Sequence, residues 1–112
     1  MDEQEQIVIN LIVNSGSARS SAIEAIQYAK AGDLAKADES LQQAKETVNE
    51  AHHSQTELIQ AEIRGEKAPL NLLMVHAQDH LMTALVVIDL AQEFIDVYKK
   101  RQKRLYKTKG IW

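Results

Sequence analysis

PLNLLMVHAQDHLMTALVVIDLAQEFIDVY, residues 69–98, is the stretch that decides how this chain folds. After Pro69 it contains neither proline nor glycine, and it is rich in Leu, Met, Ala, Gln and Glu, which favour helices. Pro69 suits the first turn of a helix, because its missing N–H leaves no hydrogen bond unmade there. The stretch therefore predicts one long α-helix that begins at Pro69.

The apolar residues of this helix form two seams instead of one. The first seam, at helical spacing, comprises Leu73, Ala77, Leu81, Ala84, Leu85, Ile88, Ala91 and Ile95. The second seam, rotated around the helix axis, comprises Leu72, Val75, Met82, Val86 and Leu90. A small bundle buries one seam of each helix, so the second seam predicts burial against other subunits.

Four polar residues follow one another at steps of three and four along one flank of this helix: His76, Asp79, His80 and Thr83. Gln78 faces away from that flank. Three interpretations are open, namely a solvent-facing side, a metal site and a reactive histidine. Two histidines four residues apart chelate zinc in the H-E-x-x-H motif, but Ala77 stands where that motif has its catalytic glutamate. A hydrolytic zinc site is therefore disfavoured.

A first helical region is expected over residues 3–31, where apolar residues recur at helical spacing. Gly16 lies among small polar residues in this region and predicts a kink or a break, with Ser17 able to cap a second segment. Alanine and serine are dense here, which favours the close approach of another helix.

A tight turn at Gly32 and Asp33 leads into the second helix, because glycine suits the left-handed position after a helix and aspartate is a good N-cap. The second helix is expected from about Leu34 to Ile63, and Gly65 ends it. Its predicted inward residues are Ala37, Leu41, Ala44, Val48, Ala51, Leu58 and Ile59. His52 and His53, near its middle, point in different directions and are expected at the surface or the bundle edge.

Three helices joined by short loops predict an all-α fold, an antiparallel up-down-up three-helix bundle. Such a bundle leaves the second seam of the third helix open, so we expect a homotrimer whose third helices meet around a three-fold axis. Asp79 of each subunit would then lie next to Asp79 of the other two subunits. Three close, buried carboxylates would repel one another unless they bind a cation or share protons.

The composition excludes several classes of protein. The chain has no cysteine, which rules out disulfides, thiol catalysis and cysteine-ligated zinc. No stretch approaches the roughly 20 consecutive apolar residues that span a bilayer. The acidic N-terminus lacks the charged-then-apolar order of a signal peptide. A soluble, cytoplasmic protein is expected.

Charge divides the chain into an acidic body and a basic tail. All 16 acidic residues lie at or before Asp96, whereas seven of the 13 basic residues lie from Lys99 onward. An acidic body argues against nucleic-acid binding. We expect a helical domain over residues 1–103 and a basic C-terminal tail over residues 104–112. The tail either steers the protein to an acidic partner or membrane surface, or simply frays into solvent after a helix C-terminus that favours cations.

The run PLNLLMVHAQDHLM, residues 69–82, resembles the active-site segment of the lactose/cellobiose class of enzyme IIA, which belongs to the bacterial phosphoenolpyruvate-dependent sugar phosphotransferase system. The resemblance extends over roughly residues 4–103, and HAQDHLM is its specific part. It implies a helical bundle whose first helix is bent near its glycine.

The resemblance also implies roles for individual residues. His76 falls where the family has its phosphorylated histidine. Asp79 matches the aspartate that, with its symmetry copies, holds a metal ion on the trimer axis, and oxygen ligands favour a hard, structural cation such as Mg²⁺. Gln78 and His80 match positions that line or support the phosphoryl site.

The function implied by the resemblance is that of a phosphocarrier. The carrier protein HPr would donate a phosphoryl group to His76, and His76 would pass it to a cysteine of enzyme IIB. Enzyme IIB would phosphorylate a β-linked disaccharide, of the cellobiose/chitobiose or lactose type, as it enters through the membrane subunit IIC. The chain itself would meet the membrane only indirectly, through IIC. The alternative is a non-catalytic helical oligomerisation or interaction module, in which His76 and Asp79 are structural. A metal-dependent helical enzyme finds no further support in the residues.

Overall fold

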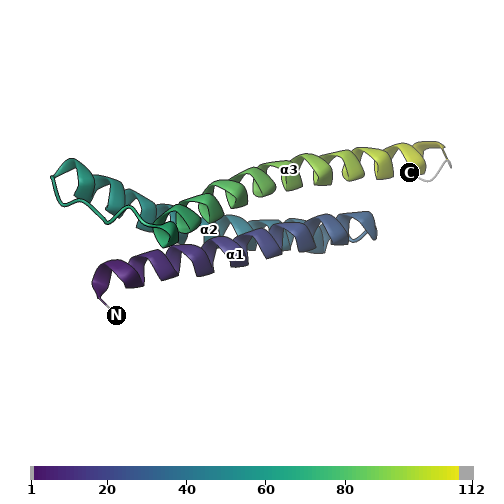
Figure 1. The fold of residues 1–112 in the computed structure, drawn as a ribbon. Helices are drawn as coiled ribbons and strands as arrows, with labels where there is room; N and C mark the ends of the chain where they lie inside the picture. Colours follow the sequence, from purple (N-terminus) through teal and green to yellow (C-terminus); the bar gives the residue numbers. More distant parts are fainter. Residues whose placement is uncertain (1, 109–112) are drawn as a thin grey trace.

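The computed structural model describes residues 2–108, which form three α-helices and no strand. The helices are α1 (Glu3–Lys30), α2 (Leu34–Ile63) and α3 (Leu72–Thr108). Figure 1 shows that the chain runs along α1, returns along α2 and then runs along α3 in the direction of α1. Both α2 and α3 pack mainly against α1. The prediction of an all-helical bundle is confirmed.

Helix α1 is continuous, so the predicted interruption at Gly16 is wrong as a break in the helix. Asp2 caps the helix, since its carboxylate accepts a hydrogen bond from the Glu5 N–H at 2.7 Å. Ser17 lies inside the helix and caps nothing. A single glycine costs a helix roughly 1 kcal/mol relative to alanine, and the packing of α1 against both other helices is large enough to offset that.

The turn between α1 and α2 confirms the sequence reading. Gly32 has a φ of 87°, in the left-handed region, and the Asp33 carboxylate accepts a hydrogen bond from the Lys36 N–H at 3.1 Å. Helix α2 has the predicted bounds, Leu34–Ile63, and is followed by Gly65 at a φ of 90°. Of its predicted inward residues, Ile59 is half exposed, because α2 diverges from α1 near its C-terminus (Figure 1).

Helix α3 begins three residues later than predicted. Pro69 lies in the loop, and the helix starts at Leu72 because the Asn71 side-chain oxygen accepts a hydrogen bond from the Met74 N–H at 2.9 Å. Asparagine is among the strongest N-caps, so it sets the start in preference to Pro69. At the other end, α3 continues through the expected boundary at residue 103 to Thr108. The rest of the expected tail, residues 109–112, lies outside the described residues.

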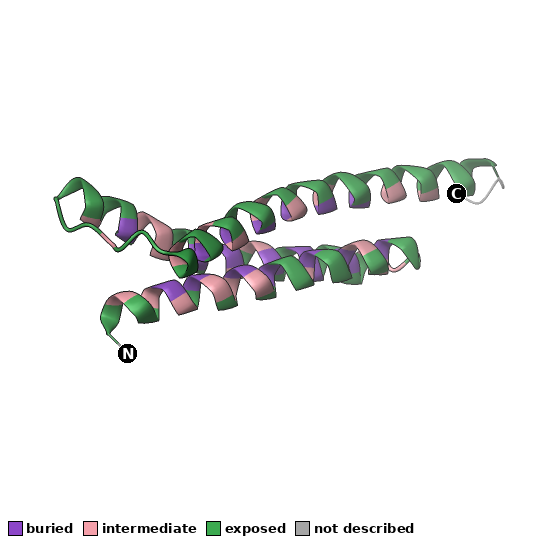
Figure 2. Ribbon diagram, in the orientation of Figure 1, coloured by how far each residue is buried: buried purple, intermediate pink, exposed green. Residues whose placement is uncertain are grey.

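Alanine dominates the core between the three helices. Ten alanines are buried with almost no exposed surface: Ala18, Ala22, Ala25, Ala29, Ala37, Ala44, Ala51, Ala77, Ala84 and Ala91. Such small side chains let helix axes approach closely, near the lower end of the usual 8–10 Å separation. Eight larger apolar side chains are also buried, and of these Leu11, Leu81 and Ile95 are fully buried. Figure 2 shows this buried side of each helix facing the others.

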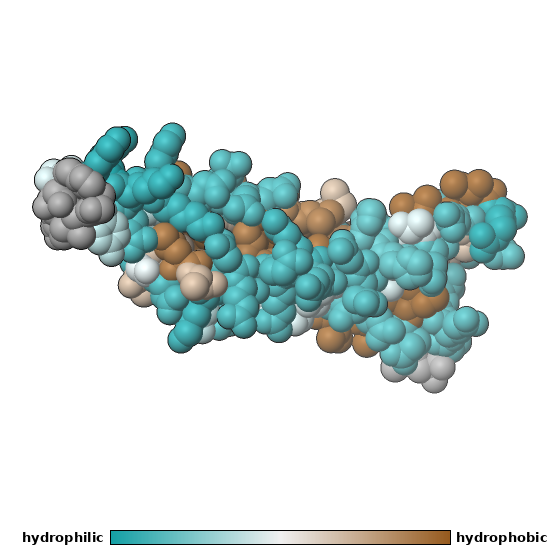
Figure 3. Space-filling model, turned by 180° about the vertical axis from the view of Figure 1, so that it is seen from behind, coloured by the Kyte–Doolittle hydropathy of each residue, from teal (hydrophilic) through white to brown (hydrophobic). Residues whose placement is uncertain are grey.

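The outer side of α3 is uncovered along its length (Figure 2). We call its apolar residues the outer stripe, and all are about half exposed or more: Leu72, Val75, Met82, Val86, Leu90, Phe94 and Val97. The stripe contains the whole predicted second seam and extends it by two residues. Leu73, assigned to the inner seam, is 42% exposed because the helix has only just begun there. Apolar side chains also reach the surface in a row along the molecule in Figure 3.

Candidate functional site

His76 and His80 lie one turn apart on α3, with their rings next to each other. Their ring centroids lie 4.2 Å apart, with the ring planes tilted by 53°. His76 is exposed, whereas His80 is half-buried and turned toward α1. Within residues 2–108 neither ring makes a hydrogen bond, so both His76 ring nitrogens are open to an incoming group. The structure therefore brings these two predicted site residues together.

Gln78 lies on a different side of α3, against α2. Its side-chain oxygen accepts a hydrogen bond from the Gln55 amide at 2.8 Å, and its own amide contacts the Met74 sulfur at 3.7 Å. This agrees with the sequence reading that Gln78 faces away from the flank of His76. Within one chain, Gln78 and His76 therefore do not form a common site.

Asp79 lies within the outer stripe, between Val75 and Met82. Its backbone carbonyl accepts a hydrogen bond from the Thr83 hydroxyl at 2.9 Å. Its carboxylate makes no hydrogen bond or ion pair with the rest of residues 2–108. An unpartnered carboxylate within an apolar surface is costly to bury unless another charged group compensates it. Among the described residues of one chain, no three histidines, cysteines or acidic residues gather closely enough to hold a metal ion.

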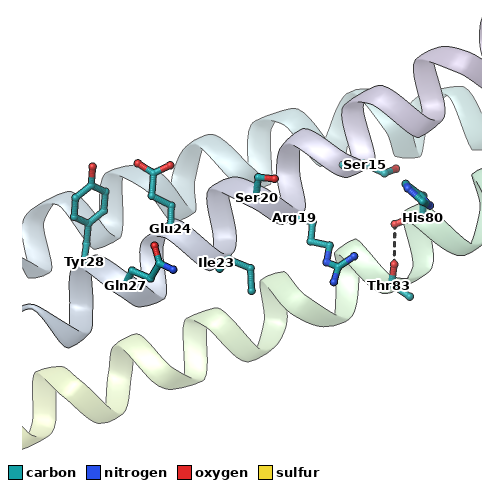
Figure 4. Close-up of a pocket in the computed structure, with 10 residues that line it drawn as sticks. Ser15, Arg19, Ser20, Ile23, Glu24, Gln27, Tyr28, His80 and Thr83 are labelled. Carbon is teal, nitrogen blue, oxygen red and sulfur yellow. Dashed lines mark hydrogen bonds between the residues drawn. The ribbon is translucent and has the colours of Figure 1, made fainter.

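A groove of about 870 Å³ runs between α1 and α3 beside His80. One end is lined by Ser15, Arg19, His80 and Thr83, and the Arg19 side chain extends across it toward α3 (Figure 4). The other end carries Glu24 and Tyr28, and the neighbouring Glu24 carboxylate raises the pKa of the Tyr28 hydroxyl. The end next to His80 therefore suits an anion better than the far end.

Sequence reasoning missed Arg19 and Ser15. One signal was available, because Arg19 is the only basic residue among the first 29 residues of an acidic body. Its placement opposite His80 depends on the packing of α1 against α3, which helical periodicity alone does not specify. His52 and His53 are exposed on α2 as expected, and His53 pairs with Glu57 at 3.3 Å.

The arrangement supports nucleophilic chemistry at His76. A neutral imidazole is a nucleophile near neutral pH, and the exposed ring of His76 is accessible to a protein-sized donor. Phosphoryl transfer depends mainly on positioning and on charge stabilisation. Helix α3 fixes the position of His76, and Arg19 places a positive charge in the groove next to His80. No helix within residues 2–108 is long and apolar enough to cross a membrane.

Comparison with known sequences identifies related proteins over nearly the whole chain. The family described as "PTS system, Lactose/Cellobiose specific IIA subunit" matches residues 6–99. The lichenan-specific phosphotransferase enzyme IIA component of Bacillus subtilis (strain 168) is 54% identical over 88% of this chain and 90% of that protein. The N,N'-diacetylchitobiose-specific EIIA component of Escherichia coli (strain K12) is 43% identical over 88% of this chain and 85% of that protein.

Solved structures agree with this relationship. The cellobiose-specific enzyme IIA from Bacillus anthracis superposes with a TM-score of 0.89 at 59% identity, covering 92% of this chain and 94% of that one. An IIA(Chitobiose) chain, solved in solution in complex with HPr, superposes with a TM-score of 0.79 at 40% identity, covering 91% and 99% of the two chains.

Proposed function

The chain belongs to the lactose/cellobiose-specific IIA family of the phosphotransferase system, whose members are phosphotransferase relay proteins, and we propose that its phosphoryl-carrying residue is His76. In this proposal a ring nitrogen of His76 attacks the phosphorus carried by HPr. The bond from phosphorus to HPr breaks as the new P–N bond forms. A second transfer, to a cysteine of enzyme IIB, then frees His76 for the next cycle.

The observation that carries this proposal is the exposure of His76. It lies at the start of a rigid helix, with both ring nitrogens open and a second imidazole 4.2 Å away. The related IIA(Chitobiose) structure, solved with HPr, supports HPr as the donor. The cellobiose, lichenan and chitobiose relatives support uptake of a β-linked disaccharide through IIB and the membrane subunit IIC, with this chain acting in the cytoplasm.

Labelling of the full chain tests the carrier function. We expect incubation with phosphoenolpyruvate, enzyme I and HPr to add the mass of one phosphoryl group to each chain, with no label when HPr is omitted. A folded protein that takes no label from HPr of more than one source would contradict the proposal. That result would favour the alternative, a non-catalytic oligomerisation module, which the outer stripe also fits.

We also propose that the subunit, an antiparallel up-down-up bundle, assembles as a homotrimer through the outer stripe. Seven half-exposed apolar residues on one face of one helix are more than a monomer usually leaves uncovered. On α3, His76 and Gln78 flank the stripe on opposite sides. Around a three-fold axis, the His76 side of one copy faces the Gln78 side of the next, so Gln78 would support the phosphoryl site of a neighbouring subunit.

The donor chemistry of Asp79 fits a cation on that axis. Three copies would bring together three carboxylates that have no partner within their own described chains, and carboxylate oxygens favour a hard ion such as Mg²⁺. The Asp79 side chains would hold the ion, and its contribution would be to offset their mutual repulsion. The proposed transfer at His76 does not involve it.

Asp79→Leu tests the cation directly. We expect this variant to remain trimeric, to be at least as stable as the parent and to lose any effect of a chelator on its melting temperature, because leucine removes the buried charges that need a cation. Asp89→Leu, which removes an exposed carboxylate elsewhere on α3, should respond to the chelator as the parent does. Sedimentation and thermal unfolding with and without EDTA give both readouts. A dissociated Asp79→Leu variant would contradict this expectation and would show that the trimer needs the carboxylates together with the cation they bind.

A further inference from the structure

Two features of α1 have no role in the fold or in the proposed transfer. Arg19 is exposed, and its guanidinium forms no ion pair with the rest of residues 2–108, although the body of the protein is acidic. Ser15, one turn earlier, is fully buried, and its hydroxyl is the one buried side-chain polar atom of the described residues without a hydrogen-bond partner. Both line the end of the α1–α3 groove that also contains His80.

The helix geometry directs Arg19 toward the histidine pair. Helices α1 and α3 run in the same direction (Figure 1), and helical side chains lean toward the N-terminus of their helix. Arg19 leans accordingly toward the level of Ser15 and His80 (Figure 4). From there His76 is one further turn, about 5.4 Å, along α3. The groove that Arg19 lines therefore runs toward the end of α3 that carries His76.

We propose that Arg19 binds the phosphoryl oxygens of phosphorylated His76, and that it neutralises their charge during transfer. The inference rests on the proposed carrier function of His76. A guanidinium group is opposite in charge to a phosphoryl group, and the planar spacing of its N–H donors fits the phosphoryl oxygens. Partial shielding from water in a groove strengthens the attraction between the two groups. The Ser15 hydroxyl marks the same end of the groove as polar. Glu24 at the opposite end repels an anion from there.

The electrostatics of the body explain why such a residue is needed. Only six basic side chains precede Lys99, against 16 acidic ones, so an incoming phosphoryl group meets a predominantly negative surface. Arg19 is the basic side chain that lines the groove beside His80. Removing Arg19 leaves the phosphoryl oxygens with neutral partners only, and a lost charge-assisted contact of this kind slows transfer by about ten-fold or more.

A small donor allows Arg19 to be tested without HPr. Phosphoramidate gives its phosphoryl group to an imidazole nitrogen: its P–N bond breaks, a P–N bond to histidine forms, and the proton displaced from the ring leaves on ammonia. In a His52→Ala, His53→Ala background only His76 and His80 remain as imidazoles. We expect Arg19→Gln to slow labelling of His76 by about ten-fold and Arg19→Lys to restore most of the rate. We also expect the NMR resonance of the Arg19 Nε–H to move when His76 is phosphorylated.

Arg64→Gln is the matched control, since it removes an exposed arginine that pairs with Glu66 at the C-terminal end of α2 and does not line the α1–α3 groove. We expect phosphoramidate to label His76 of this variant at the same rate as His76 of the parent. Equal labelling of Arg19→Gln and the parent, or an Arg19 resonance that ignores phosphorylation, would overturn the inference, as would an equal slowing by Arg64→Gln. If phosphoramidate labels His76 with the Arg19 resonance responding, while HPr gives no label, the carrier function fails and the Arg19 contact stands.

Discussion

His76→Ala is expected to take up no phosphoryl group from HPr at all. Alanine offers no nucleophile, and the neighbouring His80 cannot substitute, because it is half-buried and turned toward the α1–α3 groove instead of the exposed face. The effect is therefore a complete loss of labelling and not a slower rate. The His76 ring is exposed and makes no hydrogen bond within residues 2–108, so its removal should leave the helix content and the melting temperature nearly unchanged.

His53→Ala is the appropriate control for this variant. His53 is also an exposed helical histidine, but it lies on α2, where it pairs with Glu57. We expect it to label to the same extent as the parent in an intact-mass measurement. Label on His76→Ala, located by peptide mapping to His80 or to α2, would reject His76 as the carrier residue and would require a different nucleophile.

The local signals in the sequence were sufficient for most of the fold. The bounds of α2 followed from Asp33 and from the glycines at 32 and 65, because capping and a positive φ are decided by residues adjacent in the chain. The start of α3 was misplaced for a related reason. Pro69 and Asn71 both favour a helix start, and the choice depends on whether the Asn71 side chain reaches the Met74 N–H, a detail of three-dimensional geometry.

The residues of the candidate site likewise fall into those that the sequence predicted and those that it did not. His76, His80 and Asp79 share one helix, so their spacing alone placed them on neighbouring positions. Arg19 precedes His76 by more than 50 residues in the chain and belongs to another helix, so its position depends on how α1 and α3 pack. The alanines of that interface allow a close approach but do not specify which side chains meet across it. Residues contributed by another helix are therefore the part that sequence patterns miss.

Val86→Asp is expected to dissociate the oligomer. Val86 lies in the middle of the outer stripe and is 56% exposed in the single chain. Burying the exposed part of this valine contributes about 1 kcal/mol, and a carboxylate buried in its place costs several kcal/mol more, at three equivalent positions at once. We expect sedimentation to give a species near 12.6 kDa, the mass of one chain, instead of a trimer. The far-UV spectrum should stay helical, because the core of the subunit lies on the other side of α3.

The control for this prediction is Ile63→Asp, which places the same charge at a residue that is 79% exposed at the end of α2, away from the stripe. It should sediment as the parent does. If both variants remain trimeric, the trimer uses a face other than the outer stripe. If Val86→Asp is monomeric and folded, its Asp79 no longer lies next to the Asp79 side chains of other subunits. This variant should then lack the response to chelators that the parent shows. Loss of assembly and loss of the cation effect in one variant would link the apolar stripe and the carboxylate within it to the same three-fold axis.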